Sequence, residues 1–227
     1  CAVYMAFPKA DKFEHVIQKA TELGACEIIA FPSSRCVAKP DEKSLSKKLE
    51  RWQKIAASAA EQSGRGRIPA VRTAKSFREA VLEASKSDLP LFPYENEKTL
   101  PLSACLKAGV YKTVSIMTGP EGGFSEDEVA FAGENNMKIC SLGPRILRCE
   151  TAPLCALTAV LFAAGGALAY IEETQKTDAS YIRSMSVYSR SQFLEMDSST
   201  RRNLELCETM RRAEKKGTLL WVLDKTK

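Results

Sequence analysis

The sequence is poor in the residues that build metal sites. It contains one histidine, His15, and its eight cysteines include no Cys-x-x-Cys pair. A structural zinc site needs closely spaced cysteine or histidine ligands, so neither zinc nor any other metal is expected. The cysteines are predicted to be reduced thiols, as is usual in the cytoplasm.

Long apolar runs and nucleotide-binding motifs are also missing. No stretch approaches the roughly 20 consecutive apolar residues of a membrane helix. The first residues lack the basic region and cleavage site of a secretion signal, which predicts a cytoplasmic protein without a membrane partner. No GxxxxGK[ST] motif occurs, so ATPase activity is not expected. A net charge of +5 is too small to indicate a polyanionic partner by itself.

Short apolar runs alternate with helical periodicity between residue 2 and about residue 165. This alternation predicts an α/β domain with a mostly parallel sheet. The expected strands are 2–7, 27–31, 70–73, 89–94, 113–118 and 138–142. Beyond Gly165 the alternation is lost and the chain becomes strongly charged. We therefore expect two parts, a domain over 1–165 and a mainly helical tail over 166–227.

The first expected helix has clear ends, with Asp11 as its cap, Glu14 at the capping-box position and Gly24 at its end. A longer helix is expected over 42–63, because its apolar residues recur every three or four positions. Basic residues share another face of this helix and continue into the turn after it. This basic strip, predicted to contact RNA phosphates, comprises Lys47, Arg51, Lys54, Arg65 and Arg67. The alternative is an ordinary solvated helix face.

The expected strand 113–118 runs through Thr118 into a glycine loop, residues 119–123 (Gly-Pro-Glu-Gly-Gly). Ser125 and Glu128 then form a capping box for the next helix. Strand, glycine-rich loop and capped helix are typical of ligand sites in open α/β sheets, since glycine lets the backbone approach a ligand closely. Taken alone, such a loop is more often a purely structural turn.

A second unusual loop follows the last expected strand. This arginine segment, residues 142–152, contains two arginines, a carboxylate and a hydroxyl before an alanine-rich helix. It could be a surface connection in which Glu150 and Thr151 cap that helix. Two adjacent strand ends that both carry unusual loops favour a site.

Together, TGPEGGFSEDEV and SLGPRILRCETA closely resemble the uracil-N3 methyltransferases of 16S ribosomal RNA, in the SPOUT superfamily. Upstream phrases agree, among them 16–24, 34–36, 51–55 and 59–65. The likeness spans about residues 3–165, and Cys149 replaces the threonine expected there. The likeness does not include the PUA-like RNA-binding barrel that members of the family ordinarily carry before this domain.

The resemblance implies a SPOUT fold with a C-terminal trefoil knot, a homodimer, and S-adenosylmethionine bound by the knot loops. The expected substrate is 16S rRNA in the small ribosomal subunit. By motif, the cofactor-binding residues are Thr118, Gly119, Glu121, Gly122 and Gly123 in the first loop, Leu142, Gly143, Ile146, Leu147 and Thr151 in the second, and Tyr94 and Glu95 in a third segment.

Methyl transfer from a sulfonium needs mainly in-line positioning of the nucleophile. Uracil N3 carries a proton, so a group must remove it or stabilise the developing anion. The expected catalytic residues are Glu150 together with Arg145 or Arg148. Arg148 is preferred as the group that stabilises the developing negative charge.

The tail, about residues 166–227, resembles part of the core (lever) domain of the mismatch-repair protein MutS. Both resemblances stop within a domain, which suggests a chimera of two truncated genes. Two alternatives to an N3 methyltransferase follow: an inactive or impaired scaffold whose tail contacts DNA or a repair partner, and a SPOUT enzyme that modifies a different RNA site.

Overall fold

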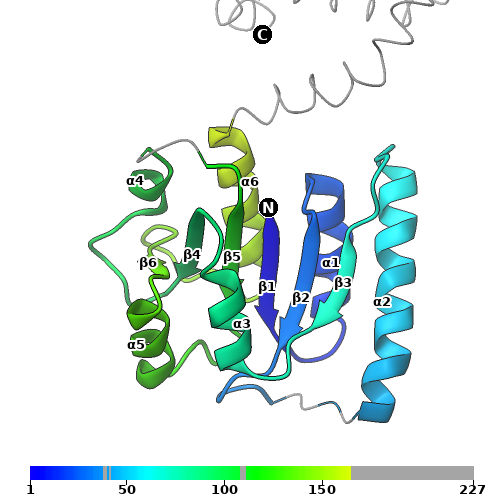
Figure 1. The fold of residues 1–227 in the computed structure, drawn as a ribbon, viewed down its shortest axis with the longest axis horizontal. Coiled ribbons are helices and arrows are strands. Elements are labelled where there is room, and N and C mark those ends of the chain that lie inside the picture. The colour runs from blue at the N-terminus through cyan, green and yellow to red at the C-terminus, as the bar shows by residue number, and fades with distance from the viewer. Residues whose placement is uncertain (38–39, 41, 108–110, 165–227) are drawn as a thin grey trace, which may run out of the picture. The chain divides into compact units, whose positions relative to one another are not determined.

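The computed structural model describes residues 1–37, 40, 42–107 and 111–164, all within the first of the two units into which the chain divides, Cys1–Ala169. Its six strands form one sheet in the order β3-β2-β1-β5-β4-β6, with parallel pairing throughout (Figure 1). The strands are β1 (Ala2–Ala6), β2 (Glu27–Phe31), β3 (Ala70–Thr73), β4 (Leu89–Pro93), β5 (Val114–Thr118) and β6 (Lys138–Cys140). The predicted α/β class is therefore confirmed, and each strand ends within two residues of its expected limits.

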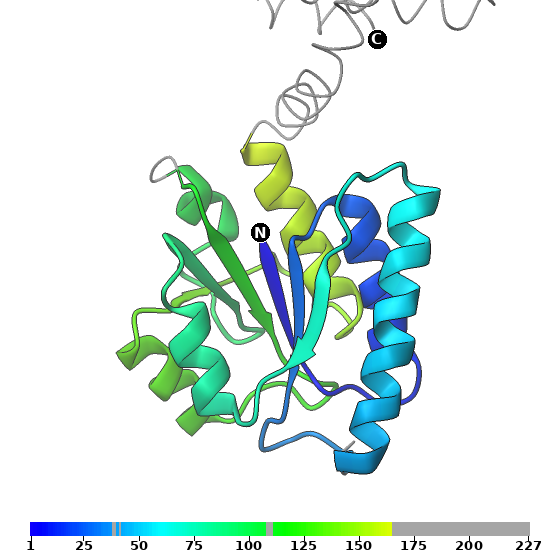
Figure 2. The ribbon, with the colours of Figure 1, turned by 45° about the vertical axis from the view of Figure 1, so that its right-hand side comes forward.

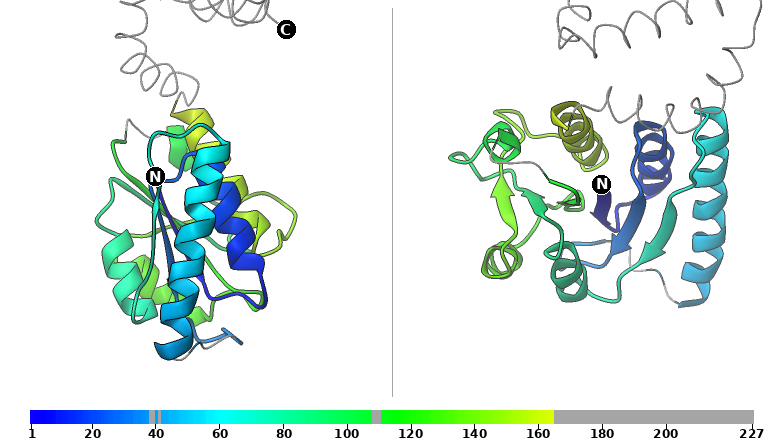
Figure 3. Two further views of the ribbon diagram at one scale, coloured as in Figure 1. Left: turned by 90° about the vertical axis from the view of Figure 1, so that its right-hand side faces the viewer. Right: turned by 45° about the horizontal axis from the view of Figure 1, so that its top comes forward.

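Helices cover both faces of the sheet. They are α1 (Lys12–Leu23), α2 (Glu42–Gln62), α3 (Phe77–Ala84), α4 (Leu102–Lys107), α5 (Glu126–Glu134) and α6 (Thr151–Ala163). Helices α1 and α6 lie on one face, and α3 and α5 lie on the opposite face (Figure 3). Because both faces are covered, β1, β2 and β5 are buried along almost their whole length, which explains the apolar runs of β1 and β2.

Helix α1 begins and ends almost where expected, but its first turn differs. Gly24 ends it in the left-handed conformation, with φ 111°, and its N–H donates to the carbonyls of Ala20 and Thr21. Asp11 occupies the predicted N-cap position, but its side chain makes no capping hydrogen bond. Glu14 instead accepts from Arg51 of α2 at 2.6 Å, so its carboxylate joins two helices.

An aromatic cluster supports the loop that follows β5. Phe124, directly after the glycine loop, is 1% exposed, and its ring centroid lies 4.3 Å from that of Phe92 in β4. The ring of Phe31 in β2 is stacked parallel to that of Phe124, with a centroid distance of 6.5 Å. Because close-packed aromatic rings leave little room for displacement, Phe124 anchors the end of the glycine loop to the sheet.

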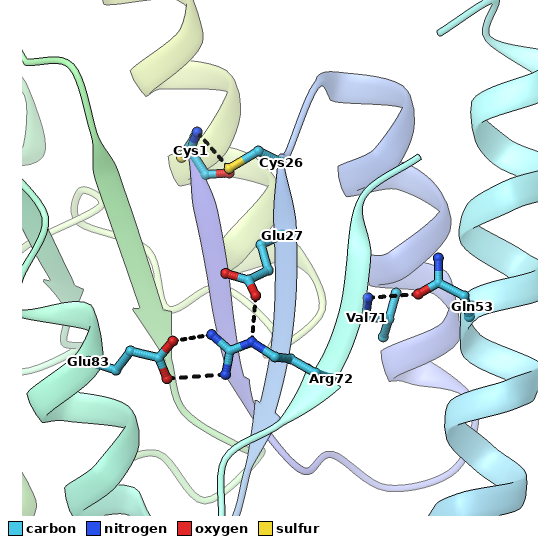
Figure 4. Close-up of polar contacts among 7 residues, drawn as sticks. All are labelled: Cys1, Cys26, Glu27, Gln53, Val71, Arg72 and Glu83. Atoms are coloured by element: carbon cyan, nitrogen blue, oxygen red, sulfur yellow. Dashed lines mark hydrogen bonds and ion pairs between the residues drawn. The ribbon is translucent and has the colours of Figure 1, made fainter. Parts of the chain in front are cut away.

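The edge strand β3 is protected by a side chain of α2. Gln53 accepts from the backbone N–H of Val71 at 3.0 Å (Figure 4). Its amide also donates to the carbonyl of Pro69 at 3.0 Å. An amide side chain thus occupies backbone groups that an edge strand would otherwise expose to another chain.

Arg72 of β3 connects its own strand to β2 and to helix α3. Its guanidinium donates to Glu27 at the start of β2 and to both carboxylate oxygens of Glu83 on α3 (Figure 4). All three side chains are between 31% and 38% exposed. The pair of carboxylates raises the pKa of Arg72, against the opposing effect of burial, so this arginine network ties α3 to the sheet.

Helix α6 returns from the far edge of the sheet to its centre. It follows the arginine segment, which leaves β6 at one edge, yet it packs against α1, β1 and β5 (Figure 2). The trefoil knot itself stays a prediction. So does the boundary at residue 165, because the tail, 166–227, lies outside the described residues.

Candidate functional site

A hollow of about 400 Å³ lies at the carboxyl ends of β4, β5 and β6. The order of the strands reverses beside it, because β2 and β3 lie on one side of β1 whereas β5, β4 and β6 lie on the other. Crevices at such switch points are the usual ligand sites of open parallel sheets. The glycine loop and the arginine segment both line this hollow, although β4 separates the strands that they follow.

Most of the predicted site residues come together here. Those that line the hollow are Tyr94, Glu95, Thr118, Gly119, Glu121, Gly122, Gly123, Leu142, Gly143, Arg145, Ile146, Leu147 and Arg148. Glu150 and Thr151 are not among the lining residues: Glu150 precedes α6, and Thr151 is exposed in its first turn. Thr118 is buried, with its hydroxyl 3.4 Å from the carbonyl of Tyr4. The roles assigned to these residues stay predictions.

Gly123 occupies a place that other residues fit poorly. Its φ is +64°, and a Cβ added there would lie 2.2 Å from Oε1 of Glu95. The Glu95 carboxylate, which follows β4, therefore rests against the bare backbone of the glycine loop. Gly119 is also close-packed, since a Cβ there would meet the backbone of Gly123 at 3.2 Å.

The predicted capping box is present and does more than cap α5. Ser125 accepts from the backbone N–H of Glu128, and the Glu128 carboxylate accepts from that of Ser125 at 2.9 Å. The other carboxylate oxygen accepts from the backbone N–H of Ser34 at 2.7 Å. Next to it, Arg35 donates to the carbonyl of Gly122 at 3.0 Å. The segment after β2 is thereby fastened to the glycine loop.

Lys12, in the first turn of α1, connects the two site loops. Its Nζ lies 3.1 Å from Oε1 of Glu121 and 3.2 Å from Oε2 of Glu150. The hydrogen bond to Glu121 raises the pKa of Lys12, burial opposes this, and Glu150 adds to the rise. Burial acts to raise the pKa of each carboxyl, but backbone N–H groups and the ammonium outweigh it, so both values fall below normal. All three groups are therefore charged at neutral pH.

Cys149, beside this ion pair, is a buried thiol. It donates to Glu150 at 3.1 Å and lies 3.7 Å from Nζ of Lys12. Burial, and then the hydrogen bond to Glu150, raise the pKa of Cys149 to about 12. It is therefore a neutral donor in the place of the threonine that the family pattern predicts, and a hydroxyl could make the same bond.

The two arginines of the arginine segment are exposed to solvent. Arg145 and Arg148 are exposed and line the hollow, and neither makes an ion pair within the described part of the chain. Ile146 between them is 84% exposed. Two cations and an apolar side chain thus surround the mouth of the hollow.

The basic strip is only partly available for a ligand. Lys47, Lys54 and Arg67 are exposed. Arg51 is paired with Glu14, and Arg65 donates to the carbonyls of Thr21 and Ala25, at 2.7 and 3.0 Å. Arg65 therefore fastens the end of α2 to the end of α1, a structural role that its position in a basic run concealed.

Sequence reasoning missed several residues of the site. The hollow is also lined by Lys12, Pro93, Ser141 and Ala152, and Arg35 holds the glycine loop through the carbonyl of Gly122. Pro93 and Ser141 adjoin predicted residues, so extending each segment by one position would have found them. Nothing local marked Lys12, whose partners are more than a hundred residues away.

Comparison with known proteins identifies the domain. A family model described as an RNA methyltransferase domain matches residues 1–161. This chain belongs to that family. Ribosomal RNA small subunit methyltransferase E of Bacillus subtilis is 43% identical over 167 residues, 70% of this chain and 65% of that protein. The protein of the same name from Mycobacterium tuberculosis is 37% identical over 165 residues, 70% of this chain and 61% of that protein.

Solved structures of methyltransferases share the fold of this chain. A ribosomal RNA small subunit methyltransferase E from Neisseria gonorrhoeae, bound to S-adenosyl methionine, is 34% identical, with a TM-score of 0.62 over 70% of this chain and 65% of that one. A methyltransferase from Legionella pneumophila, also crystallised with this cofactor, is 33% identical, with a TM-score of 0.64 over 71% and 66%. The resemblance drawn from the two site loops, and the SPOUT-type fold class, are confirmed.

The chain spans about two thirds or less of the length of these curated relatives. A separate match joins it to the DNA mismatch repair protein MutS of Ruminiclostridium cellulolyticum, which is 53% identical over 64 residues, 28% of this chain and 7% of that protein. The predicted resemblance to a piece of MutS is therefore also confirmed. The tail to which it was assigned lies outside the described residues.

The sequence predicts neither a metal site nor a membrane helix, and the structure can be searched for both only in the residues that it describes. Within those ranges, no three histidine, cysteine or carboxylate residues are grouped so as to hold a metal ion. No helix there combines the length and hydrophobicity of a membrane span.

Proposed function

We propose that this chain binds S-adenosylmethionine in the hollow beside the glycine loop and methylates N3 of a uracil in the 16S rRNA of the small ribosomal subunit. One observation carries the proposal: the two loops that match the methyltransferase family line a single hollow at the switch point of the sheet. The bound cofactor in two related structures supports the same assignment.

The residues present suit this cofactor chemically. A hollow of about 400 Å³ is within the range of small-molecule sites, about 300 to 1,000 Å³. Its glycines leave backbone N–H and C=O groups open to an adenine edge, and Leu142, Ile146 and Leu147 supply apolar contacts. The carboxylate of Glu95, which lines the hollow beside Gly123, complements a positively charged ligand.

The chain contributes orientation and electrostatics to the reaction. When bound, the sulfonium cofactor supplies an activated methyl group. The protein must then hold the uracil close to it and stabilise the negative charge that develops as N3 loses its proton. Arg148 and Arg145 are suited to the second task, because both are exposed at the mouth of the hollow without an ion-pair partner in the described part of the chain.

Glu150 is less suited to the role of base that its sequence position suggested. Its carboxylate accepts from Cys149 and pairs with Lys12, and its pKa is lowered. A carboxylate that binds protons more weakly than usual is a poor proton acceptor. We therefore assign charge stabilisation to Arg148 and only a positioning role to Glu150.

Methyl transfer to small subunits that lack the modification tests the proposal. The purified chain, supplied with labelled S-adenosylmethionine, should place label in 16S rRNA that is recovered as 3-methyluridine. Arg148→Ala should lower kcat by about a hundredfold with cofactor affinity unchanged, because it removes one group that stabilises the transition state. Arg78→Ala, a change on α3 outside the hollow, is the matched control and should keep full activity.

The outcomes separate the competing assignments. Absence of label in rRNA with the unmodified chain would refute the proposal. Label recovered as a different nucleoside would assign the chain to another RNA site. The homodimer implied by the family resemblance stays a prediction that size determination in solution can check.

The match to MutS supports a second candidate, a scaffold that binds DNA through its tail. The full chain should then bind a labelled mismatched duplex. Affinity that survives Gly123→Val, combined with no methyl transfer by the unmodified chain, would favour the scaffold over the enzyme. Absence of duplex binding would eliminate it.

A further inference from the structure

The two loops of the hollow have no direct connection through the sheet. The glycine loop follows β5 and the arginine segment follows β6, and β4 lies between these strands. The glycine loop is held by Phe124 at its end and by Arg35 at Gly122, and the arginine segment continues into α6, but none of these contacts joins one loop to the other. Something else must hold the middle of the two loops at a fixed separation if they are to grip one ligand.

Lys12 is placed to do this from a third element. It follows β1 on the first turn of α1, and its ammonium reaches Glu121 of the glycine loop and Glu150 of the arginine segment. Glu121 also accepts from the backbone N–H of Lys9 at 3.0 Å, and Glu150 accepts from Cys149. Each carboxylate therefore has a second donor that fixes its orientation toward the ammonium.

We propose that Lys12 is a positioning residue that clamps the glycine loop to the arginine segment and so sets the width of the cofactor hollow. Without the ammonium, two carboxylates that now share one cation would face each other unneutralised. Like charges at such separation repel, and the loops that carry them would move apart. Lys12 contacts no reacting atom in this scheme. The effect on cofactor affinity rests on the proposed function, whereas the effect on the loops does not.

Hydrogen exchange on the full chain without cofactor tests the clamp directly. Lys12→Met should speed the exchange of backbone amides in 119–123 and 142–150 together, by about tenfold. Lys19→Met is the matched control, because Lys19 lies on the same helix and pairs at 2.8 Å with Glu22, away from the hollow. It should leave both loops unchanged. Glu150→Gln, which keeps the pair with Glu121, should loosen 142–150 only.

Titration of S-adenosylmethionine then measures the consequence. Lys12→Met should weaken affinity about tenfold, and Lys12→Arg, which keeps the charge, should recover most of it. The double variant Lys12→Met with Glu150→Gln should bind better than Lys12→Met alone, because it removes one of the repelling charges. A role confined to helix packing would give no such recovery.

Several results would overturn the inference. Unchanged exchange in both loops of Lys12→Met would exclude the clamp, as would equal exchange changes in Lys12→Met and Lys19→Met. Normal affinity of Lys12→Met in a titration where the unmodified chain binds would show that the clamp does not set the hollow. If the unmodified chain binds no cofactor, the proposed function fails, and the exchange experiment still decides the clamp.

Discussion

Replacing Gly123 with valine is expected to weaken S-adenosylmethionine binding by about a hundredfold. At φ +64° a non-glycine residue costs roughly 1–2 kcal/mol, and a β-branched one suffers most. The new Cβ would also occupy space 2.2 Å from Oε1 of Glu95, which forces that carboxylate away. The empty loop of the variant relieves this strain by leaving the binding conformation, so that restoring it on binding costs about tenfold in affinity. The displaced carboxylate and distorted loop account for the rest.

Calorimetric titration of the unmodified chain and the variant measures this loss. Gly133→Val is the matched control, since Gly133 lies on α5 with nothing within 4 Å of an added Cβ. It should bind like the unmodified chain. Gly123→Ala with Glu95→Ala separates the two causes: the double variant should keep the strain and lose the clash. Affinity of Gly123→Val within threefold of normal would show that the glycine loop does not form the site.

Local signals predicted the parts of the site that depend on neighbouring residues. The alternation of strands and helices and the capping box of Ser125 and Glu128 are such features, and all are present. The positive φ of Gly123 likewise follows from a residue type that tolerates it. The two motifs also predicted, without knowledge of the strand order, that both loops belong to one site. The reason is that parallel strands place their carboxyl ends at one edge of the sheet.

Long-range partners could not be predicted in the same way. A lysine at the start of a helix has the same sequence signature whether it faces water or two distant carboxylates, as Lys12 does. Arg65 illustrates the converse, because an apparent phosphate ligand in a basic run donates to two helix-end carbonyls. Strand order decides both cases, and it is set by packing of the whole domain rather than by local propensity.

Arg72→Met is expected to destabilise the domain by about 2 kcal/mol. It leaves the carboxylates of Glu27 and Glu83 without the cation they share. Breaking a fully buried pair costs about 3–5 kcal/mol and an exposed one about 0–1 kcal/mol, and side chains about one-third exposed fall between these limits. The expected fall in melting temperature is about 4–8 °C.

Thermal and urea unfolding at pH 7 measure this change without interference from Tyr4, a buried phenol that interacts with Glu83 and Arg72. Burial, and then the negative charge of Glu83, raise the pKa of Tyr4 above its ordinary value, to about 12. Since the folded-state value is the higher one, the stability contributed by the neutral phenol is complete below pH 10 and is lost as pH rises toward 12.

Arg51→Met is the matched control for the arginine network, because it breaks a single ion pair in which the arginine is 66% exposed. Its cost should stay below about 1 kcal/mol. Arg72→Met with Glu83→Met should recover part of the loss, since only one unpaired carboxylate then remains. Equal losses for Arg72→Met and Arg51→Met would mean that the network contributes no more than a surface ion pair, and that α3 is held on the sheet by its apolar face alone.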